Sequence, residues 1–269
     1  MVNKRGAAML YSDVLQSLQQ QNGVWTAAVP EDWLQGRSVF GGLQAAFALK
    51  AMRALAPAGM PLRTLQVTFI APVLAGGVSV QARLLRTGKN AVHAEARLMD
   101  DEQVLCSVIG VFGARRESTV TVTPQQPVVE VQKSIEFRHI PGVTPTFTQH
   151  FSARWLRGGI PFSNSSSTEA VIEIGMHDSG GASEAHVLAL ADFIPPVALA
   201  MLKTPAPGSS LTWMMEFLTE SFEPLPLTGW RVDAQLVAAR DGYTNQSVML
   251  WGPGGVPVAL SRQSMVVFG

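Results

Sequence analysis

The chain has 269 residues, of which 47% are hydrophobic and 15% charged, and its 20 Lys and Arg balance 20 Asp and Glu. This composition indicates a globular protein with a large core. The zero net charge, with no basic block, argues against nucleic acid or an anionic membrane as the main partner and favours self-association. The single cysteine, Cys106, excludes an internal disulfide and fits a reducing compartment.

The first half is predicted to begin with a short helix and a strand. Leu10, Val14 and Leu18 recur at helical spacing, which predicts a helix over residues 7–20. A strand at 24–29 and a loop at 31–38 follow. After a second helix, which is described below, alternating apolar residues and short turns indicate an antiparallel meander. Its four strands are expected at 64–71, 78–86, 91–99 and 103–112.

The helix predicted over residues 43–55 is apolar on nearly every face and rich in alanine. It follows the motif Val39-Phe40-Gly41-Gly42. A helix without a polar face belongs inside a protein, and this one is too short to cross a bilayer. We therefore expect a sheet curled around a buried helix, with the glycine pair allowing a ligand to approach the helix start.

The second half is predicted to repeat this arrangement. Residues 117–145 contain several prolines and no sustained period, so we interpret them as a linker between domains at 7–116 and 146–269. A second short apolar helix is expected at 192–202, opened by Asp192. The strands are expected at 147–155, 169–176, 211–218, 230–239, 244–251 and 256–268.

Three matches between the halves indicate an internal duplication. The strand end at Phe69 corresponds to that at Phe217, and residues 82–86 correspond to 234–238. Val111-Phe112-Gly113 corresponds to Val267-Phe268-Gly269, a shift of 268 − 112 = 156 residues. A repeat of this length is typical of a duplicated domain rather than a solenoid.

The order of several motifs carries a family resemblance. They are Val39-Phe40-Gly41-Gly42, residues 65–72, Val111-Phe112-Gly113, Asp192 before Pro195-Pro196, the strand ending at Phe217, and residues 258–263. Over residues 25–269 the chain resembles the acyl-CoA thioesterase II (TesB-like) family. The resemblance implies an α+β double hotdog fold, in which two tandem domains each wrap an antiparallel sheet around a central apolar helix.

The resemblance also implies an activity and a site. The family hydrolyses acyl-CoA thioesters without a covalent serine or cysteine intermediate and without a cofactor. Asp192 would then be the general base, while Gln263 and Ser210 would hold the attacking water. The register leaves Ser209 or Thr212 as alternatives for the hydroxyl group.

The start of the first apolar helix would supply the other half of the chemistry. Unpaired backbone N–H groups at Gly41, Gly42 and Leu43, beside the positive end of the helix, would hold the developing oxyanion. Trp213, Met214 and Met215 would either line an acyl pocket or form plain core.

Each candidate also has a purely structural interpretation. Asp192 would be an ordinary N-cap, and Gln263 a solvent-facing strand residue. Ser210 would be a turn residue after Pro207-Gly208. The glycine pair would simply allow close helix packing.

Other chemistries lack their motifs. The histidines show no metal-ligand spacing, there is no Gly-x-Ser-x-Gly elbow and no P-loop, and Cys106 lies in an apolar strand as inert core.

Two alternative functions stay open. An acyl-CoA hydratase or dehydratase would need a histidine or acidic base near a helix start, and we expect no histidine within either apolar helix. The other is a non-catalytic acyl-CoA or lipid-binding protein.

The remaining expectations concern surroundings. No charged start followed by an apolar segment and a cleavage site is present, so we expect a cytoplasmic protein. We expect acyl-CoA as its partner, neither nucleic acid nor membrane, no metal, and a homodimer formed through sheet edges.

Overall fold

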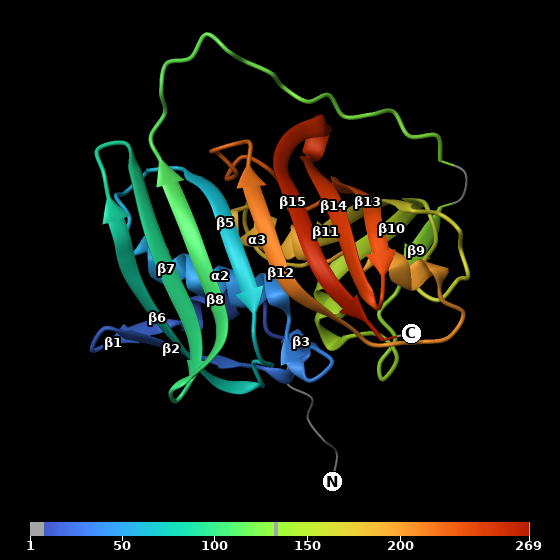
Figure 1. The fold of residues 1–269 in the computed structure, drawn as a ribbon, viewed down its shortest axis with the longest axis horizontal. Helices are drawn as coiled ribbons and strands as arrows, with labels where there is room; N and C mark the ends of the chain where they lie inside the picture. Colours follow the sequence, from blue (N-terminus) through green and yellow to red (C-terminus); the bar gives the residue numbers. More distant parts are fainter. Residues whose placement is uncertain (1–7, 132–133, 269) are drawn as a thin grey trace.

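A computed structural model describes residues 8–131 and 134–268. One large antiparallel sheet lies over two central helices, and in the view of Figure 1 the strands are in front of the helices. The first half contains α1 (Tyr11–Ser17), β1 (Gln19–Gln21), β2 (Val24–Val29), η1 (Glu31–Trp33), β3 (Leu34–Gln35), β4 (Ser38–Val39), α2 (Gly41–Arg53), β5 (Leu62–Phe69), β6 (Gly76–Thr87), β7 (Ala91–Asp100) and β8 (Gln103–Gly113). The second contains β9 (Ile135–Phe137), η2 (Thr146–His150), β10 (Phe151–Arg157), β11 (Glu169–Met176), α3 (Glu184–Asp192), η3 (Val197–Met201), β12 (Gly208–Phe217), β13 (Trp230–Arg240), β14 (Tyr243–Gly252), η4 (Pro253–Gly255) and β15 (Val256–Val267).

The two halves share one sheet. Its order is β1-β2-β6-β7-β8-β5-β12-β15-β14-β13-β11-β10-β9, so corresponding strands follow one another outward from the β5–β12 junction. At that junction Val67 pairs with Trp213 in antiparallel register. Each half is a meander packed on a central helix, which confirms the predicted double hotdog architecture.

Bulges recur at corresponding places in the two halves. An extra residue interrupts pairing at Arg63 and Leu211, at Leu85 and Val237, and at Leu105 and Val258. A bulge inserts one residue into one strand, so shared bulges fix the alignment of the repeats.

That alignment confirms two of the three predicted matches. The offset is 211 − 63 = 148 in β5 and β12, as for Phe69 and Phe217, and 237 − 85 = 152 in β6 and β13, as for residues 82–86. The third match is wrong. Phe112 corresponds to Met265, because each pairs with the residue just before the first bulge of its half. Gly269 lies outside the described residues.

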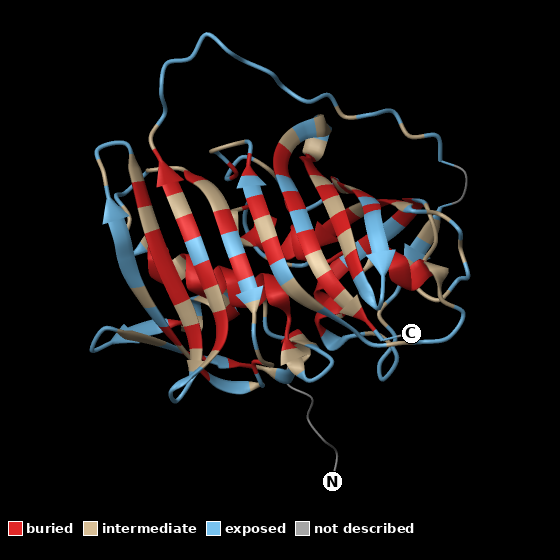
Figure 2. Cartoon of the chain, viewed as in Figure 1, coloured by how far each residue is buried: buried red, intermediate tan, exposed pale blue. Residues whose placement is uncertain are grey.

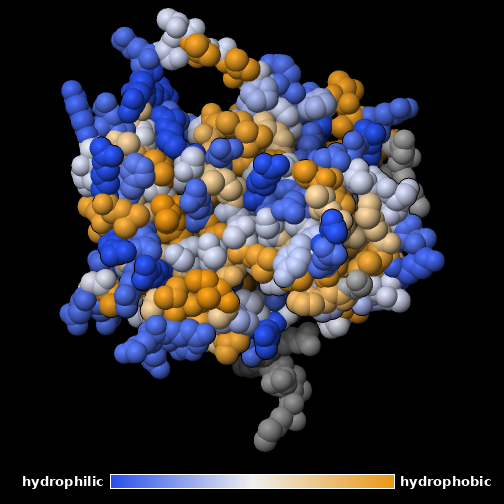
Figure 3. All heavy atoms as spheres, viewed as in Figure 1, coloured by the Kyte–Doolittle hydropathy of each residue, from blue (hydrophilic) through white to orange (hydrophobic). Residues whose placement is uncertain are grey.

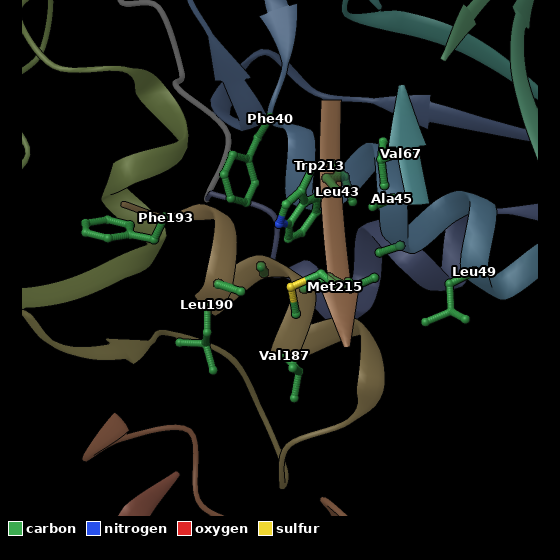
Figure 4. Packing of buried hydrophobic residues seen from close by; sticks show 14 of the residues in the cluster. Phe40, Leu43, Ala45, Leu49, Val67, Val187, Leu190, Phe193, Trp213 and Met215 are labelled. Atoms are coloured by element: carbon green, nitrogen blue, oxygen red, sulfur yellow. The ribbon is translucent and has the colours of Figure 1, made fainter. Parts of the chain in front are cut away.

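Helix α2 is buried as predicted, although it begins two residues earlier and ends two earlier than expected. Its first turn packs on α3 so closely that a Cβ on Gly42 would lie 2.9 Å from the Cα of Ala189. Figure 4 shows side chains of α2 (Leu43, Ala45 and Leu49), α3 (Val187 and Leu190) and β12 (Trp213 and Met215) that belong to one buried cluster. The glycine therefore sets the distance between the helices.

The second helix differs from its prediction. It spans Glu184–Asp192, and only the short 3-10 helix η3 follows. Pro195 and Pro196 explain this, because proline disfavours a helical conformation in the residue before it and donates no backbone hydrogen bond. Ser183 is the N-cap, accepting the N–H of His186. Asp192 thus ends α3, and the expectation that no histidine lies in this helix is wrong.

Smaller differences concern element ends. The predicted first helix is shorter and is followed by β1, with residue 7 outside the described part. Residues 31–38 are not a plain loop but contain η1, β3 and part of β4. The strand predicted from residue 147 begins at Phe151, after η2. Within the predicted linker, β9 pairs with β10 and extends the sheet edge (Figure 1).

The sheet is amphipathic. Along its central strands, buried and exposed residues alternate (Figure 2), and the face turned away from the helices mixes polar and apolar side chains (Figure 3). The segment Glu184–Met201 has the length and hydropathy of a membrane span, but 78% of it is buried inside the protein. Core helices of soluble domains share this composition, so it is accounted for as core.

Candidate active site

Asp192, at the C-terminal end of α3, faces the start of α2. Its Oδ1 accepts a 2.6 Å hydrogen bond from Nε2 of Gln263, and the backbone N–H of Gly42 also donates to the carboxylate. A Cβ on Gly41 would lie 2.7 Å from Oδ2 of Asp192. The glycine pair therefore lets a helix start and a carboxylate meet without intervening side chains.

Burial dominates the electrostatics of this carboxylate. Asp192 is 7% exposed, and desolvation raises its pKa to about 7, although the hydrogen bonds from Gln263 and Gly42 act in the opposite direction. A general base works best when its pKa is near the operating pH. Asp192 therefore has the basicity that activation of water near neutrality requires. Its interpretation as an N-cap is wrong.

Gln263 lies on the inner face of β15. It is 2% exposed and pairs with the buried Trp213 on one side and with Gln246 on the other. Its solvent-facing interpretation is therefore wrong. The structure brings Asp192 and Gln263 together, as the resemblance implies.

Gln246 in β14, which was not predicted from the sequence, completes a buried cluster with Asp192 and Gln263. Its Nε2 donates to Oε1 of Gln263 over 3.2 Å, and it is fully buried. The available signal was its place in the alternation of β14, on the face that also carries Val248 and Leu250. A glutamine on an apolar strand face needs buried partners.

The strand register separates the three candidate hydroxyl groups. Ser210 pairs with Met265, a buried residue on the same face of β15 as Gln263, whereas Ser209 and Thr212 pair with Val266 and Ser264 of the opposite face. Ser210 is half-buried. Within the described chain no hydrogen bond joins Ser210 to Asp192 or Gln263, so its role stays a prediction.

The expectation of three unpaired N–H groups at the start of α2 requires correction. Gly42 donates to Asp192, and the Leu43 N–H donates to the carbonyl of Phe40 over 3.1 Å. The first turn of a helix leaves its N–H groups free only where no local acceptor competes. The oxyanion prediction is thereby narrowed to Gly41.

The surroundings of the site are densely packed. Phe40 stacks on Phe147 with 4.1 Å between ring centroids, and Phe193, next to Asp192, lies 5.0 Å from Phe151. Trp213 is core, with its indole N–H donating to Ser261 over 2.7 Å. Met215 is also buried core, whereas Met214 pairs with Gln66 and Arg262 on the outer face.

Two surface pockets lie away from Asp192. One, of about 500 Å³, is bordered by β9, β10 and β11; the other, of about 510 Å³, by the 57–61 loop and Glu220. Neither pocket is lined by Asp192, Gln263 or Gln246.

The corresponding position in the first half is apolar. Counting from the shared bulges, Gly110 corresponds to Gln263 and Ala94 to Gln246. A Cβ on Gly110 would lie 3.2 Å from Cε of Met52, so the side chain of Met52 fills the space beside Gly110. The duplicated fold therefore contains a single carboxylate–glutamine cluster of this kind in the residues described.

The described residues contain neither a cluster of metal-binding side chains nor an exposed thiol. Between residues 8 and 268, apart from 132–133, no group of three or more His, Cys, Asp or Glu could hold a metal ion; the metal-free site stays a prediction. Cys106 is fully buried, which raises the pKa of its thiol to about 12, so the prediction of an inert core cysteine is confirmed.

Two family models match the chain. One, described as the acyl-CoA thioesterase N-terminal domain, matches residues 29–113, and the other, the acyl-CoA thioesterase C-terminal domain, matches residues 123–267. The second alone covers more than half of the chain. No curated protein matches it at a significant level.

Solved structures share the fold at low sequence identity. A conserved hot dog protein of unknown function from Alicyclobacillus acidocaldarius is 23% identical, with a TM-score of 0.84 and coverage of 96% of this chain and 98% of that one. A thioesterase II from Thermobifida fusca, so named only provisionally, is 13% identical (TM-score 0.78, coverage 98% and 100%). A tesB protein from Mycobacterium avium subs paratuberculosis is 14% identical (TM-score 0.77, coverage 97% and 100%). These similarities show the fold alone.

Proposed function

Because the chain belongs to the acyl-CoA thioesterase family, we propose that it hydrolyses an acyl-CoA thioester to free CoA and a carboxylic acid by direct attack of water. The observation that carries this proposal is the buried Asp192 carboxylate, held by Gln263 and facing Gly41 at the start of α2. Asp192 ends α3 and faces the start of α2, and a carboxylate with a pKa near 7 in this place suits water activation better than it suits a structural role.

In the proposed reaction Asp192 removes a proton from water while the water oxygen forms a bond to the thioester carbon. Gln263 and Ser210 orient that water, and the Gly41 N–H, with the positive end of α2, stabilises the oxyanion. The C–S bond then breaks, and the proton passes from Asp192 to the departing thiolate. The rate should rise through pH 6 to 8 and level off above, because only ionised Asp192 accepts the proton.

A hydratase or dehydratase function has less support. His186 lies in the first turn of α3, where such a reaction would need a base. Its Nδ1 contacts Oγ of Ser183 at 2.8 Å, and its Nε2 contacts Oδ2 of Asp178 at 3.0 Å. Both ring nitrogens are thus committed within the protein, so a hydratase would have to use Asp192 as its base, and the assay below separates the two reactions.

The test is hydrolysis of a panel of acyl-CoAs, with the released thiol captured by a chromogenic reagent. We expect CoA release that is lost in Asp192→Ala and kept in Cys106→Ala. Hydration of crotonyl-CoA without CoA release would favour the hydratase. Tight acyl-CoA binding without turnover would indicate a binding protein.

The cytoplasmic location and the homodimer stay predictions. Cell fractionation would check the location, and sedimentation would check the oligomeric state.

A further inference from the structure

A directional chain of hydrogen bonds ends at Asp192. The backbone N–H of Val197 in η3 donates to Oε1 of Gln246 over 3.0 Å, and Nε2 of Gln246 donates to Oε1 of Gln263 over 3.2 Å. Nε2 of Gln263 then donates to Oδ1 of Asp192 over 2.6 Å. All three side chains are buried, so water does not replace these bonds.

The direction of this chain is set at its far end. A backbone N–H can only donate, so Gln246 must turn its carbonyl oxygen toward Val197 and its NH₂ group toward Gln263. Gln263 must then accept with its oxygen, which leaves its NH₂ group for Asp192. Without Gln246, the amide of Gln263 would be free to rotate and present its oxygen instead.

We propose that Gln246 is a positioning residue for the thioesterase reaction, which holds the amide of Gln263 in the one orientation that donates to the catalytic carboxylate. This inference rests on the proposed function. Gln246 does not contact Asp192 by any described hydrogen bond, so it acts through Gln263. Groups one step removed from a reacting centre commonly fix the orientation of those that contact it.

The first half shows that the fold itself does not require a glutamine at this place. Ala94 occupies the corresponding position in β7, opposite Gly110, and both strands keep their register there. In an apolar row, two glutamines would be unfavourable unless each satisfied the other. The glutamine pair lies beside Asp192, and the corresponding described residues of the first half are Ala94 and Gly110, which links the pair to the carboxylate rather than to sheet formation.

The ionisable surroundings of Asp192 simplify a pH experiment. Tyr11 of α1 is an ionisable group whose pKa is raised in part by Asp192, and burial raises that pKa well above its ordinary value. Its hydroxyl donates to the carbonyl groups of Gly42 and Ala185. Tyr11 is therefore neutral throughout the pH range in which Asp192 titrates. The polar groups that contact the Asp192 carboxylate are Gln263 and the backbone of Gly42.

The main variant is Gln246→Leu, which removes both hydrogen bonds at similar volume. We expect kcat to fall about tenfold with KM little changed. The acid limb of the kcat/KM profile should move up by roughly half a pH unit or more, because a weaker hydrogen bond to the ionised carboxylate raises its pKa. In Gln263→Ala, adding Gln246→Leu should cause no further loss.

Two more variants guard the interpretation. Gln246→Met fits the same space without adding a charge and also lacks both hydrogen-bonding groups, so the acid limb should move the same way even if the leucine variant folds poorly. Thr244→Val is the matched control. Thr244 is buried on the same face of β14, and its Oγ1 has no hydrogen-bond partner in the part of the chain described. An equal shift in Thr244→Val would overturn the inference.

A readout independent of activity separates the two claims. The carboxyl carbon of Asp192, assigned by its loss in Asp192→Asn, can be titrated by ¹³C NMR in the full chain. A raised pKa in Gln246→Leu with no CoA release by the wild type would support the positioning and overturn the proposed function. CoA release with kcat, pH profile and carboxyl titration all unchanged in Gln246→Leu would overturn the positioning alone.

Discussion

The starts of the two central helices occupy corresponding places in the duplicated fold but differ in chemistry. At α2, Gly41 and Gly42 present bare backbone to Asp192, and no side chain caps the helix. At α3, Ser183 caps the helix, and Glu184 pairs with Arg53 from the end of α2. The start of α2 is therefore left without a side-chain cap, whereas the start of α3 is covered by Ser183 and by the Glu184–Arg53 pair.

This difference shows how a duplicated fold can specialise. Both halves need the same strands, bulges and buried helix, because these elements make the core. A buried carboxylate is unfavourable unless hydrogen bonds stabilise it, so retaining a second one without a function would weaken the fold. In the first half these strand positions are apolar: they hold Gly110 and Ala94, with Met52 packed against Gly110. In the second half they are polar: they hold Gln263 and Gln246, and Gln263 is bonded to Asp192.

The strongest test of this comparison neutralises one carboxylate at each helix start. Asp192→Asn should lower kcat roughly a thousandfold, because the amide cannot accept a proton from water. Glu184→Gln removes a half-buried ion pair at the other start and should leave kcat unchanged, while lowering the free energy of unfolding by about 1 kcal/mol or less. Steady-state kinetics and urea unfolding measure both. Equal losses of kcat would end the assignment of one site per chain.

A second test adds a methyl group in each half. In Gly41→Ala the new Cβ would lie 2.7 Å from the Asp192 carboxylate and 3.0 Å from the ring of Phe69, so the carboxylate must move. A displacement of this size should lower kcat about a hundredfold. Gly110→Ala is the matched change, and the flexible side chain of Met52 can yield to it. If Gly41→Ala keeps full activity, the close approach is unrelated to catalysis.

The hydroxyl group gives a finer comparison, between the two faces of β12. Ser210→Ala should lower kcat several-fold, up to about tenfold, because one hydrogen bond to the water is lost. Thr212→Val changes a hydroxyl on the outer face and should leave the kinetics unchanged. The reverse result, measured with the same acyl-CoA, would show that the pairing with Met265 does not decide which hydroxyl reaches the site.

The last expected effect is on stability rather than on kcat, and it depends on pH. The pKa of Asp192 is raised from 3.8 to about 7 in the folded state, so between these values the folded protein holds a proton that the unfolded chain has released. The free energy of unfolding should therefore fall as the pH rises from 4 to 7, by a few kcal/mol at most. Asp192→Asn should lack this contribution. From pH 4 to pH 7 the free energy of unfolding should therefore fall more in the wild type than in the variant. Urea titrations at pH 5 and pH 8 would measure it, and a constant difference would contradict the raised pKa.

The sequence by itself determined the local elements and the duplication. The strands predicted at 24–29 and 169–176 match β2 and β11 to their end residues, and the absence of a polar face predicted that α2 is buried. These features depend on neighbours along the chain, which set both the strand period and the helical face. The family resemblance also named Asp192 and Gln263, which the structure joins by a hydrogen bond.

Only the tertiary structure decided how the site is assembled. Asp192 and Gln263 are 71 residues apart, and Gln246 joins them from a third element, so no local pattern contains their geometry. The sequence pattern placed Asp192 at a helix start because aspartate is a common N-cap, whereas Ser183 took that role and Pro195 prevented a helix beyond it. Packing of α3 against the start of α2 then buried the carboxylate, and burial gave it the pKa of a base.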